Sequence, residues 1–184
     1  MNLALGMGLN KMRHGALLNQ NEDLSDWLYK STFNIDTNAI SAEVENVAVR
    51  VFLSESTYDF AKFKAGGADV RFADKYDNVL KHEIEYWIDT PGSEEAVCWV
   101  LLPSISASNN YFVMYYGNLS AVDKQQVTDL WQAAGAVAVW HFAEGSGTLV
   151  KDSCSTPANG TDNKPTPTWH GSNGISALEL NPDK

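Results

Sequence analysis

Apolar and polar residues alternate along much of the chain between residues 27 and 122, which is the pattern of strands with one buried face. The clearest stretch is 47–53, in which every second residue is Val or Leu. The other strands that the pattern predicts are 29–36, 68–72, 80–87, 96–102 and 111–116. Turn-forming residues separate these stretches, and no long helical pattern intervenes. The sequence therefore predicts an all-β fold, an antiparallel β-sandwich or jelly roll.

Residues 123–131 carry the one helical pattern. Val127, Leu130 and Trp131 fall on one side of it, and Asp123 is the expected N-cap. We expect a short connecting helix followed by one more apolar strand at 135–142. The predicted domains are an extended N-terminal arm at 1–24, a β-sandwich at 25–122, a helical connector at 123–134 and a partial β segment at 135–184.

The arm has large apolar residues that alternate with alanine and glycine, and two bases follow them. Period-two alternation with this much glycine favours an extended segment over a helix. Two interpretations are open: a disordered tail, or an assembly arm that adds a strand to the sheet edge of a partner. The residues of the assembly arm would be Leu3, Leu5, Met7, Leu9, Lys11 and Arg13. A secretory signal would place its bases first, so we expect no leader here.

The charge balance limits the partners. With 13 basic and 23 acidic residues, the chain has a formal charge of -10, which disfavours binding to nucleic acid or to an anionic membrane. No stretch approaches the ~20 apolar residues of a membrane span, so no membrane insertion is expected. Cys98 lies in an apolar run, and nothing local brings it near Cys154, so we expect no disulfide.

Glu83 and Glu85 are the best candidate carboxylate pair. Residues i and i+2 of a strand share a face and lie ~6.5 to 7 Å apart, a spacing that inverting glycosidases use. A surface salt-bridge network is the favoured interpretation, because Asp69, Arg71 and Lys81 are expected on faces that could pair with the two glutamates. A ligand site is the alternative.

Trp87 is the tryptophan most suited to stacking on a sugar. It is out of phase with Leu80 and Ile84, which places it on the charged face beside Glu85. The predicted ligand-binding residues are therefore Trp87, Glu83, Glu85 and Arg71.

Other chemistry is sparse. His82 and His141 have no second ligand at metal-binding spacing, and core or edge packing is expected of both. No phosphate loop, Cys-x-x-Cys, zinc-protease motif or nucleophile elbow is present, so we predict no catalytic residues and no enzyme. We expect no cofactor and no metal site; the one candidate for Ca²⁺ is the oxygen-rich loop at 152–163.

Several uncommon pieces follow one another between residues 27 and 122, at 27–30, 66–72, 83–87, 98–100 and 115–118. In identity and order they resemble the DUF2341 family of bacterial and phage surface domains. Residues 139–147, with 152–153 and 159–160, resemble the opening strands of a concanavalin-like LamG jelly roll. Residues 135–184 are too few for such a sandwich, so they are either a partial LamG domain or strands that complete the first domain.

The resemblance implies a setting rather than an activity, because no established catalytic residues come with the family. We expect a non-catalytic structural, assembly and surface-presentation protein of a phage virion, such as a capsid decoration, fibre or tail-associated component, anchored by its arm. The expected partners are other virion or surface proteins and further copies of the chain. The alternative is a carbohydrate-binding module of a bacterial surface protein or glycosidase, on the cell surface or secreted, with glycans as partners.

Overall fold

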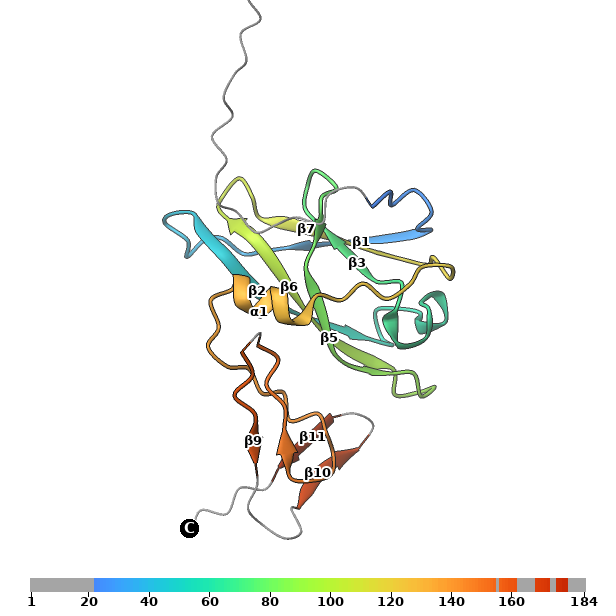
Figure 1. Cartoon of the computed structure of the whole chain (residues 1–184). Helices are drawn as coiled ribbons and strands as arrows, with labels where there is room; N and C mark the ends of the chain where they lie inside the picture. The colour runs from blue at the N-terminus through green and yellow to red at the C-terminus, as the bar shows by residue number, and fades with distance from the viewer. Residues whose placement is uncertain (1–21, 155, 162–167, 173–174, 179–184) are drawn as a thin grey trace, which may run out of the picture.

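The computed structural model describes residues 22–154, 156–161, 168–172 and 175–178 (Figure 1). Two antiparallel sheets form its body, with strand orders β1-β7-β3-β4 and β2-β6-β5. Their strands are β1 (Tyr29–Asn34), β2 (Val44–Ser54), β3 (Arg71–Ala73), β4 (Val79–Leu80), β5 (His82–Ile88), β6 (Glu95–Ile105) and β7 (Tyr111–Tyr116). The prediction of an all-β sandwich with one short helix is confirmed for the described residues.

The alternating pattern produces the core between the two sheets. Along β6, Cys98 and Val100 point inward and are fully buried, and they meet Phe72, Phe112 and other apolar side chains of the opposite sheet. Burying each such side chain contributes roughly 1.5–3 kcal/mol, which makes this layer the main source of stability. The short helices η1 (Phe60–Lys62) and η2 (Ala65–Gly67) close one end of it.

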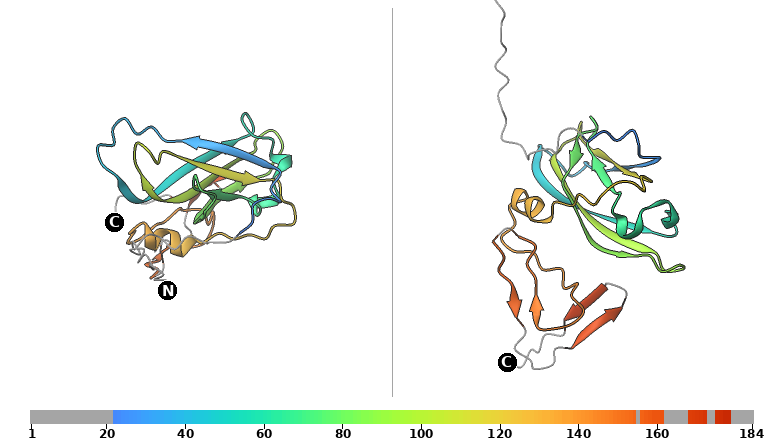
Figure 2. Two further views of the ribbon diagram at one scale, coloured as in Figure 1. Left: turned by 90° about the horizontal axis from the view of Figure 1, so that it is seen from above. Right: turned by 45° about the vertical axis from the view of Figure 1, so that its right-hand side comes forward.

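A second, smaller core lies on the outer face of the β2-β6-β5 sheet. The helix α1 (Val127–Ala133) packs there, where Leu101 of β6 meets Leu130, Trp131 and Cys154. Figures 1 and 2 show α1 against this sheet, with the C-terminal strands beyond it. These strands are β8 (Leu149–Val150), β9 (Gly160–Thr161), β10 (Trp169–Ser172) and β11 (Ile175–Leu178), in two two-stranded sheets.

The helix begins later than predicted, and Asp123 is not its N-cap. The cap residue is Gln126, whose backbone N–H donates to the carbonyl of His82 on β5. The chain before α1 is therefore tied to the edge of β5. The Asp123 carboxylate accepts a hydrogen bond from the backbone N–H of Gln125 instead.

Three predicted strands differ from the structure. The strand predicted at 68–72 begins only at Arg71, where β3 starts, because residues 65–69 form a short helix and a turn. The predicted strand 80–87 divides at Lys81, because β4 belongs to one sheet and β5 to the other. The predicted strand 135–142 is absent, and Trp140 forms only an isolated bridge with Asp152. Phe142 has a positive φ of 56°, which extended strands do not adopt.

Candidate functional site

A β-bulge in β5 positions the two candidate glutamates. Glu83 lies opposite Trp99 of β6, and the register then shifts between Ile84 and Tyr86. The extra residue at the bulge is Glu85, and its carboxylate accepts a hydrogen bond of 2.7 Å from the indole Nε1 of Trp99. Both glutamates therefore lie on the outer face of the sheet, beneath α1 and the segment that follows it.

Glu83 is buried and receives donors from two later parts of the chain. Its Oε2 accepts a hydrogen bond of 2.5 Å from Nε1 of Trp131 on α1. Its Oε1 accepts one of 3.4 Å from the hydroxyl of Ser153. One carboxylate on β5 thus holds the helix and the chain near β8 against the sandwich.

His141 lies between the two glutamates. Its Nε2 is 3.2 Å from Oε2 of Glu83, and its Nδ1 is 3.8 Å from Oε2 of Glu85. We call Glu83, Glu85 and His141 the carboxylate–histidine cluster. The predicted partners of the glutamates are wrong: Lys81 contacts Asp129 instead, at 3.7 Å.

The surroundings of His141 favour its charged form. Burial alone would lower the pKa of the imidazole, but the hydrogen bond to Glu83 and the negative charges of Glu83, Glu85 and Glu144 outweigh it, so the pKa is raised above 6.5. The cluster is thus most strongly paired when His141 carries a proton.

The carboxylate of Glu83 is largely buried and engaged in hydrogen bonds. The Glu83 side chain is only 7% exposed, and both of its oxygens already accept hydrogen bonds. Among the described residues, no group of three or more His, Cys, Asp and Glu side chains could hold a metal ion. The hydrogen bonds of Glu83 join β5 to α1 and to the segment that follows the helix.

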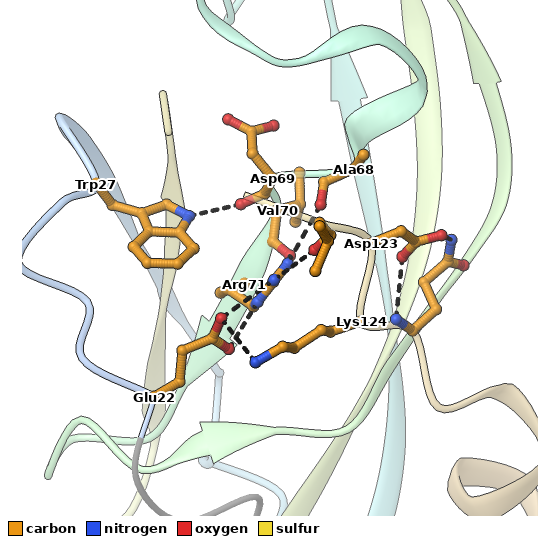
Figure 3. A network of polar contacts seen from close by, with 10 residues as sticks. Glu22, Trp27, Ala68, Asp69, Val70, Arg71, Asp123 and Lys124 are labelled. Carbon is orange, nitrogen blue, oxygen red and sulfur yellow. Dashed lines mark hydrogen bonds and ion pairs between the residues drawn. The ribbon is translucent and has the colours of Figure 1, made fainter. Parts of the chain in front are cut away.

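Arg71 lies in a different place, at the start of β3 (Figure 3). Its side chain is 1% exposed, and its Nε donates to Oε2 of Glu22 at 2.8 Å. Its Nη2 donates to the carbonyl of Val122 at 2.7 Å. Lys124 pairs with the same glutamate at 3.2 Å, and the ring of Trp27 lies under the guanidinium.

We call Arg71, Glu22, Trp27 and Lys124 the arginine clasp. Burial would raise the pKa of Glu22, but the hydrogen bonds and positive charges of Arg71 and Lys124 outweigh it, so the pKa is lowered. The expected pairing of Arg71 with the β5 glutamates is therefore wrong. The clasp joins the segment before β1 to the segment before α1.

Asp69, also expected to pair with the glutamates, supports the turns on either side of the clasp. Its carboxylate accepts hydrogen bonds from the backbone N–H groups of Lys64, Gly117 and Asn118. Its backbone carbonyl accepts one from the Trp27 indole at 2.6 Å. These bonds fix three loops at one end of the sandwich.

Trp87 lies on the core face, and the prediction that it shares the charged face with Glu85 is wrong. The bulge reverses the alternation, so Trp87 packs with Ile84 against the aromatic core. Its ring centroid is 5.2 Å from those of Phe60 and Phe63. A side chain built at Gly67 would collide with its ring, so this ring has a close-packed neighbour and is no open stacking platform.

In the candidate calcium loop at 152–163, the carboxylate of Asp152 binds backbone N–H groups. The carboxylate of Asp152 accepts hydrogen bonds from the backbone N–H groups of Val139, Cys154 and Ala158, which lower its pKa to about 2. Residues 155, 162 and 163 of this loop lie outside the described residues. The same holds for the arm residues Leu3, Leu5, Met7, Leu9, Lys11 and Arg13.

His82 and Cys98 are buried on the core side. Burial and the nearby charge of Arg71 lower the pKa of His82 to about 4, so it is neutral at physiological pH. Burial raises the pKa of the Cys98 thiol to about 12. Cys98 and Cys154 are free thiols, as expected.

The fold is a two-sheet β domain. The helix α1 covers the outer face of the β2-β6-β5 sheet, and buried charged side chains hold distant segments of the chain together. Residues 66–152 match the family described as "Domain of unknown function (DUF2341)". The predicted resemblance is therefore confirmed from residue 66, and the match continues through α1 to Asp152. It includes the whole carboxylate–histidine cluster. No family match supports the LamG-like segment.

No curated protein and no solved structure matches the chain. Among the described residues, no helix is long and apolar enough to cross a membrane.

Sequence reasoning missed the partners that define both sites. His141 is 58 residues from Glu83, and Glu22 is 49 residues from Arg71. Local periodicity carries no information about such pairs. The one available signal was compositional: a buried arginine or glutamate in an apolar strand requires a partner of opposite charge somewhere in the chain.

Proposed function

We propose that this chain is a non-catalytic structural and assembly protein that presents its sandwich on a surface and attaches to partners through its N-terminal arm, the residues that precede Glu22. One observation supports this most. Glu83, the most deeply placed of the candidate glutamates, is occupied by hydrogen bonds from Trp131, His141 and Ser153, which join distant segments. Side chains that hold the fold together in this way are poorly available for turnover.

The setting that we propose is a virion or, as the alternative, a bacterial surface. The sequence resemblance to phage and surface domains motivates it, and the acidic charge of -10 suits a protein that does not bind nucleic acid. The carbohydrate-binding alternative depended on an exposed Trp87. Because Trp87 packs against Phe60 and Phe63, we favour assembly over glycan binding.

Deletion of residues 1–20 tests the proposal. The shortened protein should keep its cooperative unfolding transition but lose incorporation into its parent particle or surface structure. Arg13→Ala in the full-length chain provides a milder second variant, since it removes one base of the arm. Unchanged incorporation of the deleted protein, with a monomeric wild type, would refute the proposed function.

A further inference from the structure

Residues 136–154, which follow α1, contact the outer side of the sandwich through a small set of side chains. We call them the docked segment. Its apolar members in the smaller core are Ala136, Val139 and Cys154, of which Cys154 is buried and the other two are partly buried. Its side chains also reach β5: His141 contacts Glu83 and Glu85, and the hydroxyl of Ser153 donates to Glu83. The docked segment is thus attached by a small apolar contact and by the carboxylate–histidine cluster.

Three carboxylates act on the imidazole of His141. Those of Glu83 and Glu85 lie 3.2 and 3.8 Å from its two ring nitrogens. The third belongs to Glu144 of the docked segment itself, whose negative charge also favours the protonated imidazole. The Oε2 of Glu144 is buried and accepts no hydrogen bond from the described residues. When His141 is neutral, three like charges remain at this junction without the imidazolium, and attraction gives way to repulsion.

The other charged groups of the elements packed here have partners of their own or lie in solvent. Lys81, next to β5, pairs with Asp129 of α1 at 3.7 Å. The carboxylate of Asp152 accepts hydrogen bonds from backbone N–H groups of the docked segment itself. The exposed ones are Arg50 of β2 and Lys151 of the docked segment. Histidine is the side chain that ordinarily changes its charge near neutral pH, so His141 sets the charge of the junction there.

We propose that His141 is a pH-sensitive latch: its protonated form holds the docked segment on the sandwich, and its neutral form releases the segment while both sheets stay folded. The proton is lost to solvent as pH rises. Because the folded pKa of His141 is raised above 6.5, the attraction is complete below pH 6.5 and is lost as pH rises through the raised value. This inference concerns a movement within one chain and does not depend on the proposed assembly role.

The sandwich should stay folded because its own core does not include the docked segment. Cys98 and Val100 of β6 point to the other side of the sheet, where they pack against the facing sheet. The start of α1 has an attachment of its own, since the backbone N–H of Gln126 donates to the carbonyl of His82. A segment with few buried apolar contacts opens at a lower free energy than the whole domain unfolds.

The two cysteines of the full-length chain report release and global unfolding separately. Cys154 is buried in the smaller core, and Cys98 is buried between the sheets. Pulses of iodoacetamide at pH 6 and pH 9, followed by peptide mass spectrometry, measure how fast each thiol is labelled. Burial raises the pKa of both thiols, so each rate is divided by that of the same thiol in urea at the same pH. The normalised rate of Cys154 should be severalfold higher at pH 9 than at pH 6, and Cys98 should stay protected at both.

Variants at position 141 separate the charge from the packing. His141→Gln carries no charge and should give the fast labelling of Cys154 already at pH 6. His141→Lys keeps its charge at both pH values and should keep Cys154 protected at both. Ser153→Ala is the matched control, because it removes another contact with Glu83 but no titratable group. Its ratio of Cys154 rates at pH 9 and pH 6 should equal that of the wild type.

Three results would overturn the inference. The first is an equal normalised rate of Cys154 at pH 6 and pH 9 in the wild type. The second is the wild-type ratio of these rates in His141→Gln. The third is labelling of Cys98 as fast as that of Cys154 at pH 9, because the whole domain would then open. If His141→Gln labels at Cys98 already at pH 6, it is unfolded, and His141→Lys decides: the same rise at pH 9 as in the wild type overturns the inference, and continued protection of Cys154 supports it.

Discussion

Two buried charged sites hold distant segments of this chain together, and they differ in the group that carries the positive charge. In the arginine clasp it is the guanidinium of Arg71, and arginine side chains as a class keep their charge in proteins. In the carboxylate–histidine cluster it is the imidazole of His141, which is charged only when protonated. Two junctions of similar construction should therefore respond differently to pH.

The largest expected effect comes from removing the charge of the clasp. Arg71→Met should lower the free energy of unfolding by about 3–5 kcal/mol, because it leaves Glu22 and the carbonyl of Val122 without their buried donor. Urea denaturation measures it. Lys62→Met, which breaks an exposed pair with Asp59, should cost under about 0.5 kcal/mol. Equal losses in the two variants would contradict the account.

The next effect distinguishes the two glutamates of the cluster. Glu83→Gln should lower the free energy of unfolding by about 1–3 kcal/mol, since this carboxylate serves Trp131, His141 and Ser153. Glu85→Gln should cost less, because its side chain is more exposed, at 20% against 7%. A larger drop in the free energy of unfolding for Glu85→Gln than for Glu83→Gln would contradict the claim that Glu83 is the more important of the two.

The pH dependence of stability compares the cluster directly with the clasp. The pKa of His141 is raised above 6.5 in the folded state, so its stabilising contribution is complete below pH 6.5 and is lost as pH rises through the raised value. Thermal melts between pH 6 and 9 should show this decline in the wild type. His141→Gln should flatten it, and Arg71→Met should not. If the melting temperature falls equally steeply with pH in His141→Gln and in the wild type, His141 is not the cause of the decline.

His82 should act in the opposite direction. Its folded pKa is lowered to about 4, so the unfolded chain binds the proton first and stability falls as pH drops from 6.5 towards 4. His82→Leu should reduce the acid-side fall in melting temperature. If the variant keeps the full fall, the loss of stability in acid has another origin.

The smallest effect is expected at the pair of Lys81 and Asp129, because its acidic partner is exposed. Asp129→Asn removes the contact with Lys81 at 3.7 Å, and the Asp129 side chain is 64% exposed. The free energy of unfolding should change by less than about 0.5 kcal/mol. A loss as large as that of Glu83→Gln would mean that burial does not decide the strength of these contacts.

The strands of the body could be predicted because their burial is local and periodic. β2 and β7 appear in the sequence as alternation, and the structure places them where the pattern does. The bulge at Glu85 could not be predicted, because one inserted residue leaves the apolar positions on either side looking like a continuous strand. That single residue moved Trp87 from the predicted charged face into the core.

The sites were less predictable than the strands. The choice of Glu83 and Glu85 as a pair was sound in placing them on one face, but their partner His141 comes from a segment that was predicted as a strand. The helix start was missed for a similar reason, since Gln126 is tied to His82 by a contact between distant residues. Contacts between distant residues therefore determine the partner of the glutamates and the start of α1, neither of which local propensity specifies.

A double-mutant cycle between Glu83 and His141 tests the central claim most directly, namely that these side chains hold the fold together. The free energies of unfolding of wild type, Glu83→Gln, His141→Gln and the double variant would be measured at pH 6. The account predicts a favourable coupling of about 0.5–3 kcal/mol that shrinks at pH 9, as His141 loses its proton. A coupling near zero at pH 6 would contradict it.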